Sequence, residues 1–134
     1  MKNPISPTAT AQLFTEARSY HAWQNKPVSD EILKQIYDLT KWGPTSVNGN
    51  PARIIFVKSA EQKEKLYPAV MGSNVEQIKQ APVTAILAFD EKWLDHIGRL
   101  MPAMNVRPYF EGNTQLLYDT VFIVTGKQIG RAHV

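Results

Sequence analysis

The sequence of 134 residues contains no cysteine. A disulfide framework and a thiolate metal site are therefore excluded. The sequence also has no apolar run long enough to cross a bilayer. Its N-terminus, MKNPISPTAT, lacks the apolar core of a signal peptide. We therefore expect a cytoplasmic protein that does not reside in a membrane.

Positive charge is in small excess and is not clustered. The formal net charge is +3, but Lys127 and Arg131 lie in the last twelve residues, which contain no acid. The rest of the chain has 13 basic and 12 acidic residues, a net charge of +1. A nucleic-acid-binding face needs a clustered basic patch. We therefore expect no nucleic-acid partner.

The motifs of the common enzyme classes are missing as well. The glycines form neither a dinucleotide-binding fingerprint nor a P-loop, and there is no HExxH or GxSxG. His21, His96 and His133 are not at metal-ligand spacing, so we expect no metal site. The absence of a catalytic acid, base or nucleophile leaves two classes: a protein without enzymatic activity, or an enzyme whose cofactor carries the chemistry.

The composition that remains is that of one globular domain, with 43% hydrophobic and 20% charged residues. Apolar periodicity and capping residues predict helices at Thr8–Arg18, from Ser29 to Gly43-Pro44, and at Ala60–Leu66, Ser73–Gln80 (capped by Ser73), Glu91–Met101 and Thr114–Phe122. Runs rich in β-branched residues predict a buried strand at Arg53–Lys58 and another at Val83–Phe89. The second run is almost continuously apolar, as in strands covered on both faces. This order of elements indicates an α/β or α+β layered domain.

The stretch Lys41–Arg53, KWGPTSVNGNPAR, is the first candidate for binding. Thr45, Ser46 and Asn48 offer two hydroxyls and an amide within four positions. The stretch is longer than most connections, and loops held by rigid flanks often carry binding residues. A plain helix-to-strand turn accounts for the same residues, because Gly, Pro, Ser and Asn favour turns wherever they occur.

A second candidate is Arg18–Trp23, RSYHAW, which has no clean helical or strand period. A surface loop explains it. An arginine, a serine hydroxyl and nearby backbone amides also suit a phosphate group. The sequence leaves both interpretations open.

The C-terminal stretch breaks the pattern of the chain. A buried helix is predicted by Leu116, Leu117, Val121 and Phe122, but IVTGKQIGRAHV follows. The last six residues of this stretch resemble one translation frame of a sequencing adapter. We expect residues 1–122 to be the N-terminal part of a single domain, and residues 123–134 to be a non-native tail that should be excluded from fold reasoning. A genuine C-terminus is the alternative.

Three segments together resemble the FMN-dependent nitroreductase family. They are ARSYHAW at 17–23, PVSDEILKQIYDLTKWGPTSVNGNPARIIFV at 27–57, and NVEQIKQAPVTAILAFD at 74–90. The most specific motif is GPTSVNGNPARI, where the family has a proline, two hydroxyl residues, an asparagine and a proline before its first long strand. Within the family, the segments are most similar to the branch that contains malonic semialdehyde reductase of pyrimidine utilisation. The resemblance covers about residues 5–122.

The resemblance implies an α+β, three-layer nitroreductase-like fold, with helices packed on a mostly antiparallel sheet, that is incomplete here because the last third of the family is missing. It also implies an intertwined homodimer that holds FMN in its interface. By position it assigns Arg18 and Ser19 to the FMN phosphate and ribityl chain, and Asn74 to the edge of the flavin ring. His21 matches a place where many members have a cation. The loop that reaches the flavin of the partner subunit is matched by Pro44, Thr45, Ser46 and Asn48.

The reaction implied is hydride transfer in two steps, with no catalytic side chain. NADH or NADPH reduces FMN and leaves, and a second substrate then takes hydride from the reduced flavin. The acceptor expected in this branch is malonic semialdehyde, which gives 3-hydroxypropionate; reduction of nitro compounds or quinones is an alternative. Two further hypotheses are an inactive truncated fragment and a binding module without redox activity.

Overall fold

The computed structural model describes residues 4–129, with side chains as far as Val121. The elements in order are α1 (Pro7–Thr10), which continues as a π-helical turn (Ala11–Thr15), α2 (Asp30–Thr40), β1 (Ala52–Val57), α3 (Ala60–Glu64), α4 (Gly72–Gln80), β2 (Thr84–Phe89), α5 (Ile97–Leu100), α6 (Arg107–Phe110) and α7 (Thr114–Ile129). Short 3₁₀ helices lie at Ser46–Asn48, Tyr67–Ala69 and Trp93–His96. The predicted order of helices and strands is confirmed, and the fold is α+β.

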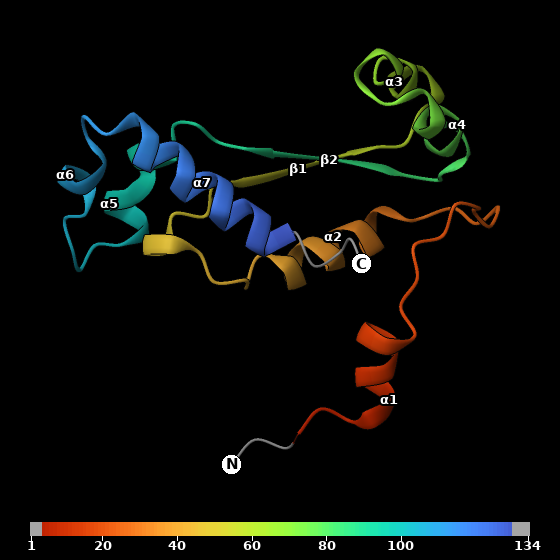
Figure 1. The fold of residues 1–134 in the computed structure, drawn as a ribbon, viewed down its shortest axis with the longest axis horizontal. Helices are drawn as coiled ribbons and strands as arrows, with labels where there is room; N and C mark the ends of the chain where they lie inside the picture. Colours follow the sequence, from red (N-terminus) through yellow and green to blue (C-terminus); the bar gives the residue numbers. More distant parts are fainter. Residues whose placement is uncertain (1–3, 130–134) are drawn as a thin grey trace.

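The two strands of the described residues form one antiparallel ribbon. Ala52 lies opposite Phe89, and Val57 lies opposite Thr84. A helical lobe, the α3–α4 lobe (residues 59–81), joins the strands and lies at one end of the ribbon, while α5 and α6 lie at the other (Figure 1).

The prediction of a strand covered on both faces is wrong for β2, as is the prediction that the first strand is buried. Residues along each strand alternate between half-buried and exposed for most of its length. Leu87 on β2 keeps 40% of its surface exposed, and Ile55 on β1 keeps 55%. An apolar run shows that a strand needs cover, but it does not show which part of the chain supplies that cover. Two strands and the helices beside them leave part of this ribbon open.

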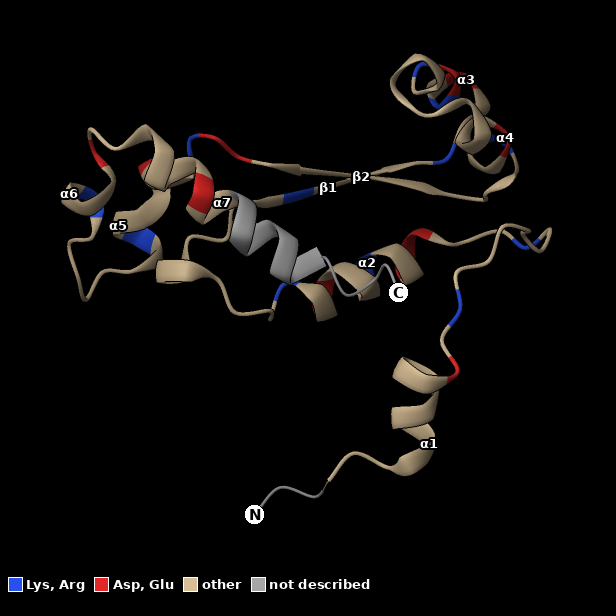
Figure 2. Ribbon diagram, viewed as in Figure 1, with Lys and Arg blue, Asp and Glu red and all other residues tan. Residues whose placement is uncertain are grey.

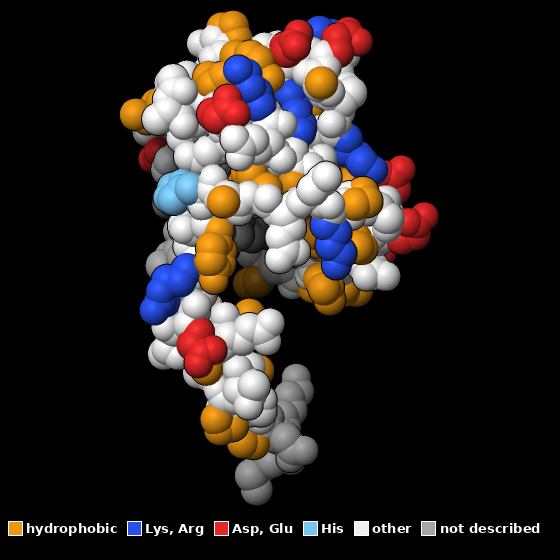
Figure 3. All heavy atoms as spheres, turned by 90° about the vertical axis from the view of Figure 1, so that its right-hand side faces the viewer, with side chains coloured by type: hydrophobic (Ala, Val, Ile, Leu, Met, Phe, Trp, Pro, Cys, Tyr) orange, Lys and Arg blue, Asp and Glu red, His pale blue; other side chains and the backbone are white. Residues whose placement is uncertain are grey.

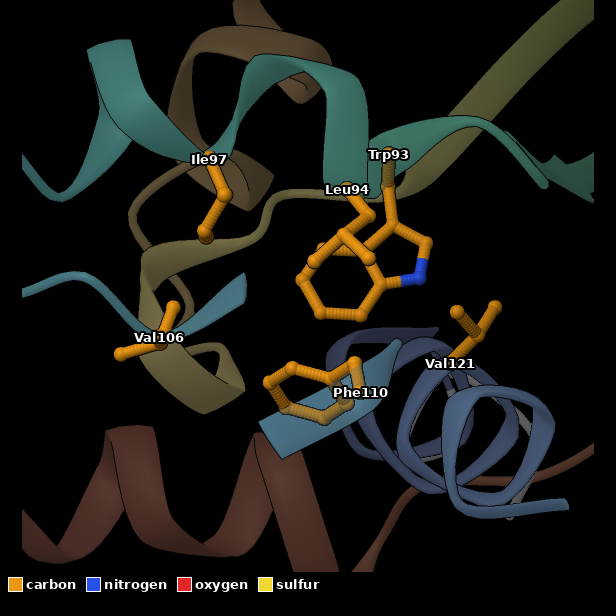
Figure 4. Packing of buried hydrophobic residues seen from close by; sticks show 6 residues of the cluster. All are labelled: Trp93, Leu94, Ile97, Val106, Phe110 and Val121. Carbon is orange, nitrogen blue, oxygen red and sulfur yellow. The ribbon is translucent and has the colours of Figure 1, made fainter. Parts of the chain in front are cut away.

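The largest set of buried side chains lies beyond the end of β2. We call this set the Trp93 cluster; it consists of Trp93, Leu94, Ile97, Val106, Phe110 and Val121 (Figure 4). Trp93 is only 1% exposed, and its ring meets that of Phe110 edge-on with a centroid separation of 5.1 Å. The predicted helix Glu91–Met101 is instead a 3₁₀ helix followed by α5, but its apolar side faces the core as predicted.

Capping residues were predicted correctly at one helix and wrongly at another. Ser29 caps α2, and its hydroxyl accepts a hydrogen bond from the Ile32 amide at 3.3 Å. Ser73 does not cap α4, because that helix begins at Gly72 and its capping residue, Met71, makes no side-chain cap bond. Sequence alone allows a cap at any nearby Ser, and the extended backbone of Met71 decides the position.

The N-terminal arm, residues 4–28, projects from the body of the molecule (Figures 1 and 3). Its helix ends at Thr15, earlier than predicted, and contains no buried residue. Leu13 and Phe14 form an apolar stripe on this helix, but each is 62% exposed. The stripe therefore has no cover within the described chain.

The C-terminal part of the described chain differs from the prediction in two ways. The segment between Met101 and Thr114, where no helix was predicted, contains α6. Helix α7 runs to Ile129 and so crosses the predicted start of a non-native tail at Ile123. Residues 130–134 of that tail lie outside the described residues, so the tail stays a prediction.

Along the described chain, Lys and Arg residues are interspersed with Asp and Glu residues (Figure 2). No helix in this part of the chain is long and apolar enough to cross a membrane. No three His, Cys, Asp or Glu side chains within residues 4–129 lie close enough to share a metal ion.

Candidate functional site

The loop between α2 and β1, residues 44–51, contains three left-handed residues. We call it the 44–51 loop. Val47, Asn48 and Asn50 have φ values of 46°, 54° and 44°. A left-handed β-branched residue such as Val47 is rare, and this conformation costs on the order of 1–3 kcal/mol. Contacts with the rest of the chain must therefore hold the loop in place.

Hydrogen bonds from side chains close the loop and fasten it to α5. Thr45 Oγ1 accepts from the Asn50 amide at 3.2 Å. Asn50 Nδ2 donates to Asn48 Oδ1 at 2.9 Å, and Asn48 Nδ2 donates to the Leu100 carbonyl at 2.7 Å. One N–H of Asn48 is thus used within the chain, and its second N–H and the O–H of Thr45 can still donate to a ligand.

Part of the loop, including Ser46, faces solvent. Pro44 and Ser46 are exposed, and Thr45 is half-buried. Because the Ser46 residue is exposed, its hydroxyl can donate to or accept from a ligand. The loop therefore offers short polar groups from a strained backbone.

The arm carries the second group of predicted residues. Arg18 Nη1 donates to the carbonyls of Thr15 at 3.0 Å and Ala17 at 2.7 Å, so the guanidinium folds over the end of its own helix. Arg18, Ser19 and His21 are exposed. A guanidinium has five N–H donors, so most of those on Arg18 remain free to bind an anion.

Asn74 alone represents the third group. It lies in the first turn of α4, its side chain is exposed, and its amide donates to the Met71 carbonyl at 2.8 Å. This position is in the α3–α4 lobe, at the end of the ribbon away from the 3₁₀ helix Ser46–Asn48 (Figure 1).

The eight predicted residues therefore lie in three separate places: the 44–51 loop, the arm and the lobe. A cavity between the end of α2 and the start of β1 contains none of them; it is lined by Tyr37, Thr40, Lys41, Asn50, Ala52, Arg53 and Ile54. A single copy of the described chain does not gather the eight residues into one pocket.

Charges beside the loop are compensated locally. Lys34 and Lys41 each donate to the Asp38 carboxylate at 2.6 Å, and these hydrogen bonds lower the pKa of Asp38 to about 2. On the far side, Arg53 pairs with Asp90 at 2.6 Å. The cations that flank the loop are thus already engaged with carboxylates.

Sequence reasoning missed the contact between Gly49 and Trp93. A Cβ built on Gly49 would lie 2.7 Å from Trp93 Cε3, so no side chain fits there. The backbone of Gly49 has φ −67°, which any residue can adopt, so glycine is needed here for space. No local signal shows this, because the two residues lie far apart in the sequence.

Comparison with known proteins identifies the family. The sequence model of the Nitroreductase family matches residues 15–118, well over half of the chain, and the match includes the arm's polar residues, the 44–51 loop and Asn74.

The chain belongs to the nitroreductase family.

Solved structures share the fold of this nitroreductase-family chain. A protein named as a nitroreductase in complex with FMN, from Exiguobacterium sibiricum, aligns with a TM-score of 0.76 at 20% identity over 98% of this chain. A protein named as an NAD(P)H:FMN oxidoreductase, from Staphylococcus epidermidis, aligns with a TM-score of 0.79 at 19% identity, also over 98% of this chain. NfrA2 of B. megaterium aligns with a TM-score of 0.69 at 25% identity over 92% of this chain.

The solved structures are longer than this chain. The alignment covers 70% of the Exiguobacterium and Staphylococcus proteins and 48% of NfrA2. The shared fold therefore extends over only part of each of these three proteins.

Proposed function

We propose that this chain, in a homodimer, is an FMN-dependent oxidoreductase that passes hydride from NADH or NADPH to a small carbonyl acceptor. The observation that carries the proposal is the 44–51 loop, a strained and internally fastened turn in which Ser46 is exposed. It lies within the part of the chain that matches the family, and relatives of the same fold include an FMN complex and a protein named as an NAD(P)H:FMN oxidoreductase.

The donors on this chain fit the acceptors of FMN. The hydroxyls of Thr45 and Ser46 and the second N–H of Asn48 suit the oxygen and nitrogen atoms of a flavin. The exposed guanidinium of Arg18 suits a phosphate, because such charge-assisted hydrogen bonds are about twice as strong as neutral ones. The residues proposed to hold FMN are Arg18, Ser19, His21, Pro44, Thr45, Ser46, Asn48 and Asn74.

The role of the protein in this reaction is binding and orientation. FMN, when bound, would supply the hydride chemistry. The 44–51 loop would fix the flavin through groups that are already oriented, and Arg18 would hold the phosphate. No side chain is assigned a proton transfer or a nucleophilic role.

The separation of the three groups in one chain supports the proposed homodimer. A second copy would let the loop of one chain face the arm of the other, so that both contribute to one site. The uncovered apolar residues Leu13 and Phe14 support such an association, because covering exposed apolar side chains stabilises a complex.

We also propose that this protein resides in the cytoplasm.

The first experiment is purification of the chain with FMN. A yellow dimer that shows a flavin absorbance band and oxidises NADH or NADPH is expected. A colourless monomer that oxidises neither nucleotide when FMN is supplied would instead favour the inactive-fragment alternative. Flavin retention with no turnover of either nucleotide would contradict the oxidoreductase proposal.

The site itself is tested with two matched arginine variants. Arg18→Ala is expected to weaken FMN binding about tenfold, the effect of losing roughly 1.4 kcal/mol. Arg99→Ala removes an exposed arginine from α5, outside the three groups, and should leave binding unchanged. Equal FMN affinity in both variants would remove Arg18 from the site.

The proposed acceptor is malonic semialdehyde, reduced to 3-hydroxypropionate. The family match favours one alternative, a broad reductase of nitro compounds and quinones. Comparing kcat/KM for malonic semialdehyde, a nitroaromatic and a quinone separates the two. A higher value for either of the last two would exclude the semialdehyde as the preferred substrate.

We also propose that residues 123–134 are not native. The test is the nucleotide sequence after the Phe122 codon in the source genome. A different continuation is expected, and a contiguous genomic read that encodes IVTGKQIGRAHV would contradict the proposal.

A further inference from the structure

We propose that Trp93 is a positioning residue for the 44–51 loop: its indole presses on Gly49 and holds the turn that presents Ser46. The link to cofactor binding rests on the proposed function. The contact between Trp93 and the loop is a property of the chain alone and can be tested without FMN.

The indole fills the space above Gly49. A Cβ on Gly49 would lie 2.7 Å from Trp93 Cε3, 2.9 Å from Trp93 Cζ3 and 3.3 Å from the Ser46 carbonyl. The Gly49 amide donates to that same carbonyl at 2.9 Å. The ring therefore covers the hydrogen bond that closes the 3₁₀ turn Ser46–Asn48.

The indole is itself held rigidly. Trp93 is 1% exposed and packs edge-on against Phe110 within the Trp93 cluster (Figure 4). Its amide donates to the Asp90 carbonyl at 3.2 Å, and the Asp90 amide donates to the Pro51 carbonyl at 2.8 Å. The backbone that carries the ring is thus tied to the last residue of the loop that the ring covers.

Two neighbouring residues of the loop bind to the same part of the molecule. Val47 packs against the Trp93 cluster, and Asn48 donates to the Leu100 carbonyl at 2.7 Å. Together with Gly49, three consecutive residues are held at once, and two of them are left-handed. Strained backbone persists where its surroundings over-determine it, and such preorganisation reduces the entropy lost when a ligand binds.

Trp93 holds the loop through the size of its ring and not through a hydrogen bond of its indole nitrogen. Trp93 Nε1 is buried and has no hydrogen-bond partner in the described chain. The Trp93 residue lines a small cavity that has no room for a water molecule. The other lining residues are Ser46, Gly49, Pro51, Thr120 and Val121. A smaller apolar ring would avoid this unpaired donor but would not reach as far across Gly49.

The test adds bulk at Gly49 without removing core atoms. With FMN absent from both samples, the peptide spanning 44–51 should exchange its amide hydrogens faster in Gly49→Ala than in the parent chain. FMN affinity, read from flavin fluorescence, should fall about tenfold. Trp93→Leu should also speed amide exchange in this peptide and weaken FMN binding. In the double variant, the loss of FMN binding energy should be smaller than the sum of the losses in the two single variants, because Leu leaves room for the Ala methyl.

Leu33→Ala is the matched control. Leu33 is also buried but lies on α2, outside the Trp93 cluster, so this variant should lower stability without changing exchange in the 44–51 peptide. If Trp93→Leu does not fold, Trp93→Phe replaces it. Parent-like exchange in Gly49→Ala, or fully additive losses, would overturn the proposal. A loosened loop with unchanged FMN affinity would overturn the link to the cofactor, and with it the loop's place in the proposed function, but not the contact itself.

Discussion

The 44–51 loop and the N-terminal arm both carry residues proposed to bind FMN, but they are stabilised in different ways. The loop rests on the Trp93 cluster, which lies inside the same chain. The arm's helix, Pro7–Thr15, has no buried residue, and isolated helices below about 12–15 residues are marginal in water. One half of the proposed site is therefore shaped by the chain itself, and the other half needs a second surface.

Helix α2 shows a similar contrast between covered and uncovered apolar side chains. Leu33 is buried, whereas Ile32, Ile36 and Leu39 lie exposed one helical turn apart from one another. The exposed stripe on α2 and the stripe on the arm are thus two apolar surfaces of similar character without cover in the described chain. The comparison can be tested with pairs of identical substitutions, one on each kind of surface.

The largest effect is expected for a phenylalanine pair. Phe110→Ala should lower the free energy of unfolding by about 3–5 kcal/mol, because it removes a ring from the Trp93 cluster. Phe14→Ala, the same change on the arm, should stay within about 0.5 kcal/mol. Urea denaturation at low protein concentration measures both. A cost above about 1 kcal/mol for Phe14→Ala that grows with protein concentration would show that a second copy covers the arm.

A lysine pair probes the α3–α4 lobe. Lys63 is buried, and its ammonium donates to the Ala81 carbonyl. Lys63→Ala should cost about 1–3 kcal/mol, because it leaves that carbonyl unpaired. Lys65→Ala, on the exposed side of the same turn, should change stability by less than about 0.5 kcal/mol. Equal losses would mean that burial of Lys63 contributes nothing.

A serine pair compares the two helix starts. Ser29→Ala should cost about 1 kcal/mol, since it removes the cap of α2. Ser73→Ala should be nearly neutral, because Ser73 caps nothing in this structure. Thermal unfolding of both variants decides, and a larger loss for Ser73→Ala would support the sequence-based cap over the observed one.

The smallest effect concerns Asp38 on the exposed side of α2. Its pKa in the folded chain is about 2, below the ordinary 3.8, because Lys34 and Lys41 donate to the carboxylate. The carboxylate's contribution to stability is therefore complete above the ordinary pKa and is lost as pH falls through about 2. An NMR titration of the carboxyl carbon should show this midpoint, and Lys34→Met should raise it. An unchanged midpoint would exclude the lysine contact.

Much of the fold could be predicted from local patterns. Ser29 and Gly43-Pro44 delimit α2, and the two β-branched runs mark β1 and β2 to within a residue or two. Burial could not be predicted in the same way. The apolar run of β2 indicates a need for cover on both faces, but Leu87 stays exposed, because cover is supplied by distant segments.

The candidate site divides along the same line. The turn within the candidate stretch Lys41–Arg53 could be predicted, since Pro, Ser, Asn and Gly favour turns through local geometry. Gly49 and Trp93 were not found, because their contact depends on the folded path of the chain. Whether Arg18, Asn74 and the loop meet in one pocket also depends on long-range packing, and one copy does not bring them together.

The lobe that joins the two strands favours one order of strand pairing during folding. Its link from Lys63 to Ala81 fastens the two ends of the connection close to where β1 ends and β2 begins. The cost of closing a loop grows by about 0.6 kcal/mol for each doubling of its length, so pairing should start at the rung next to the lobe, Val57 with Thr84. The strands would then pair toward Ala52 and Phe89, and this last rung would bring Trp93 close to Gly49. We therefore expect the loop proposed to hold the cofactor to form after the ribbon.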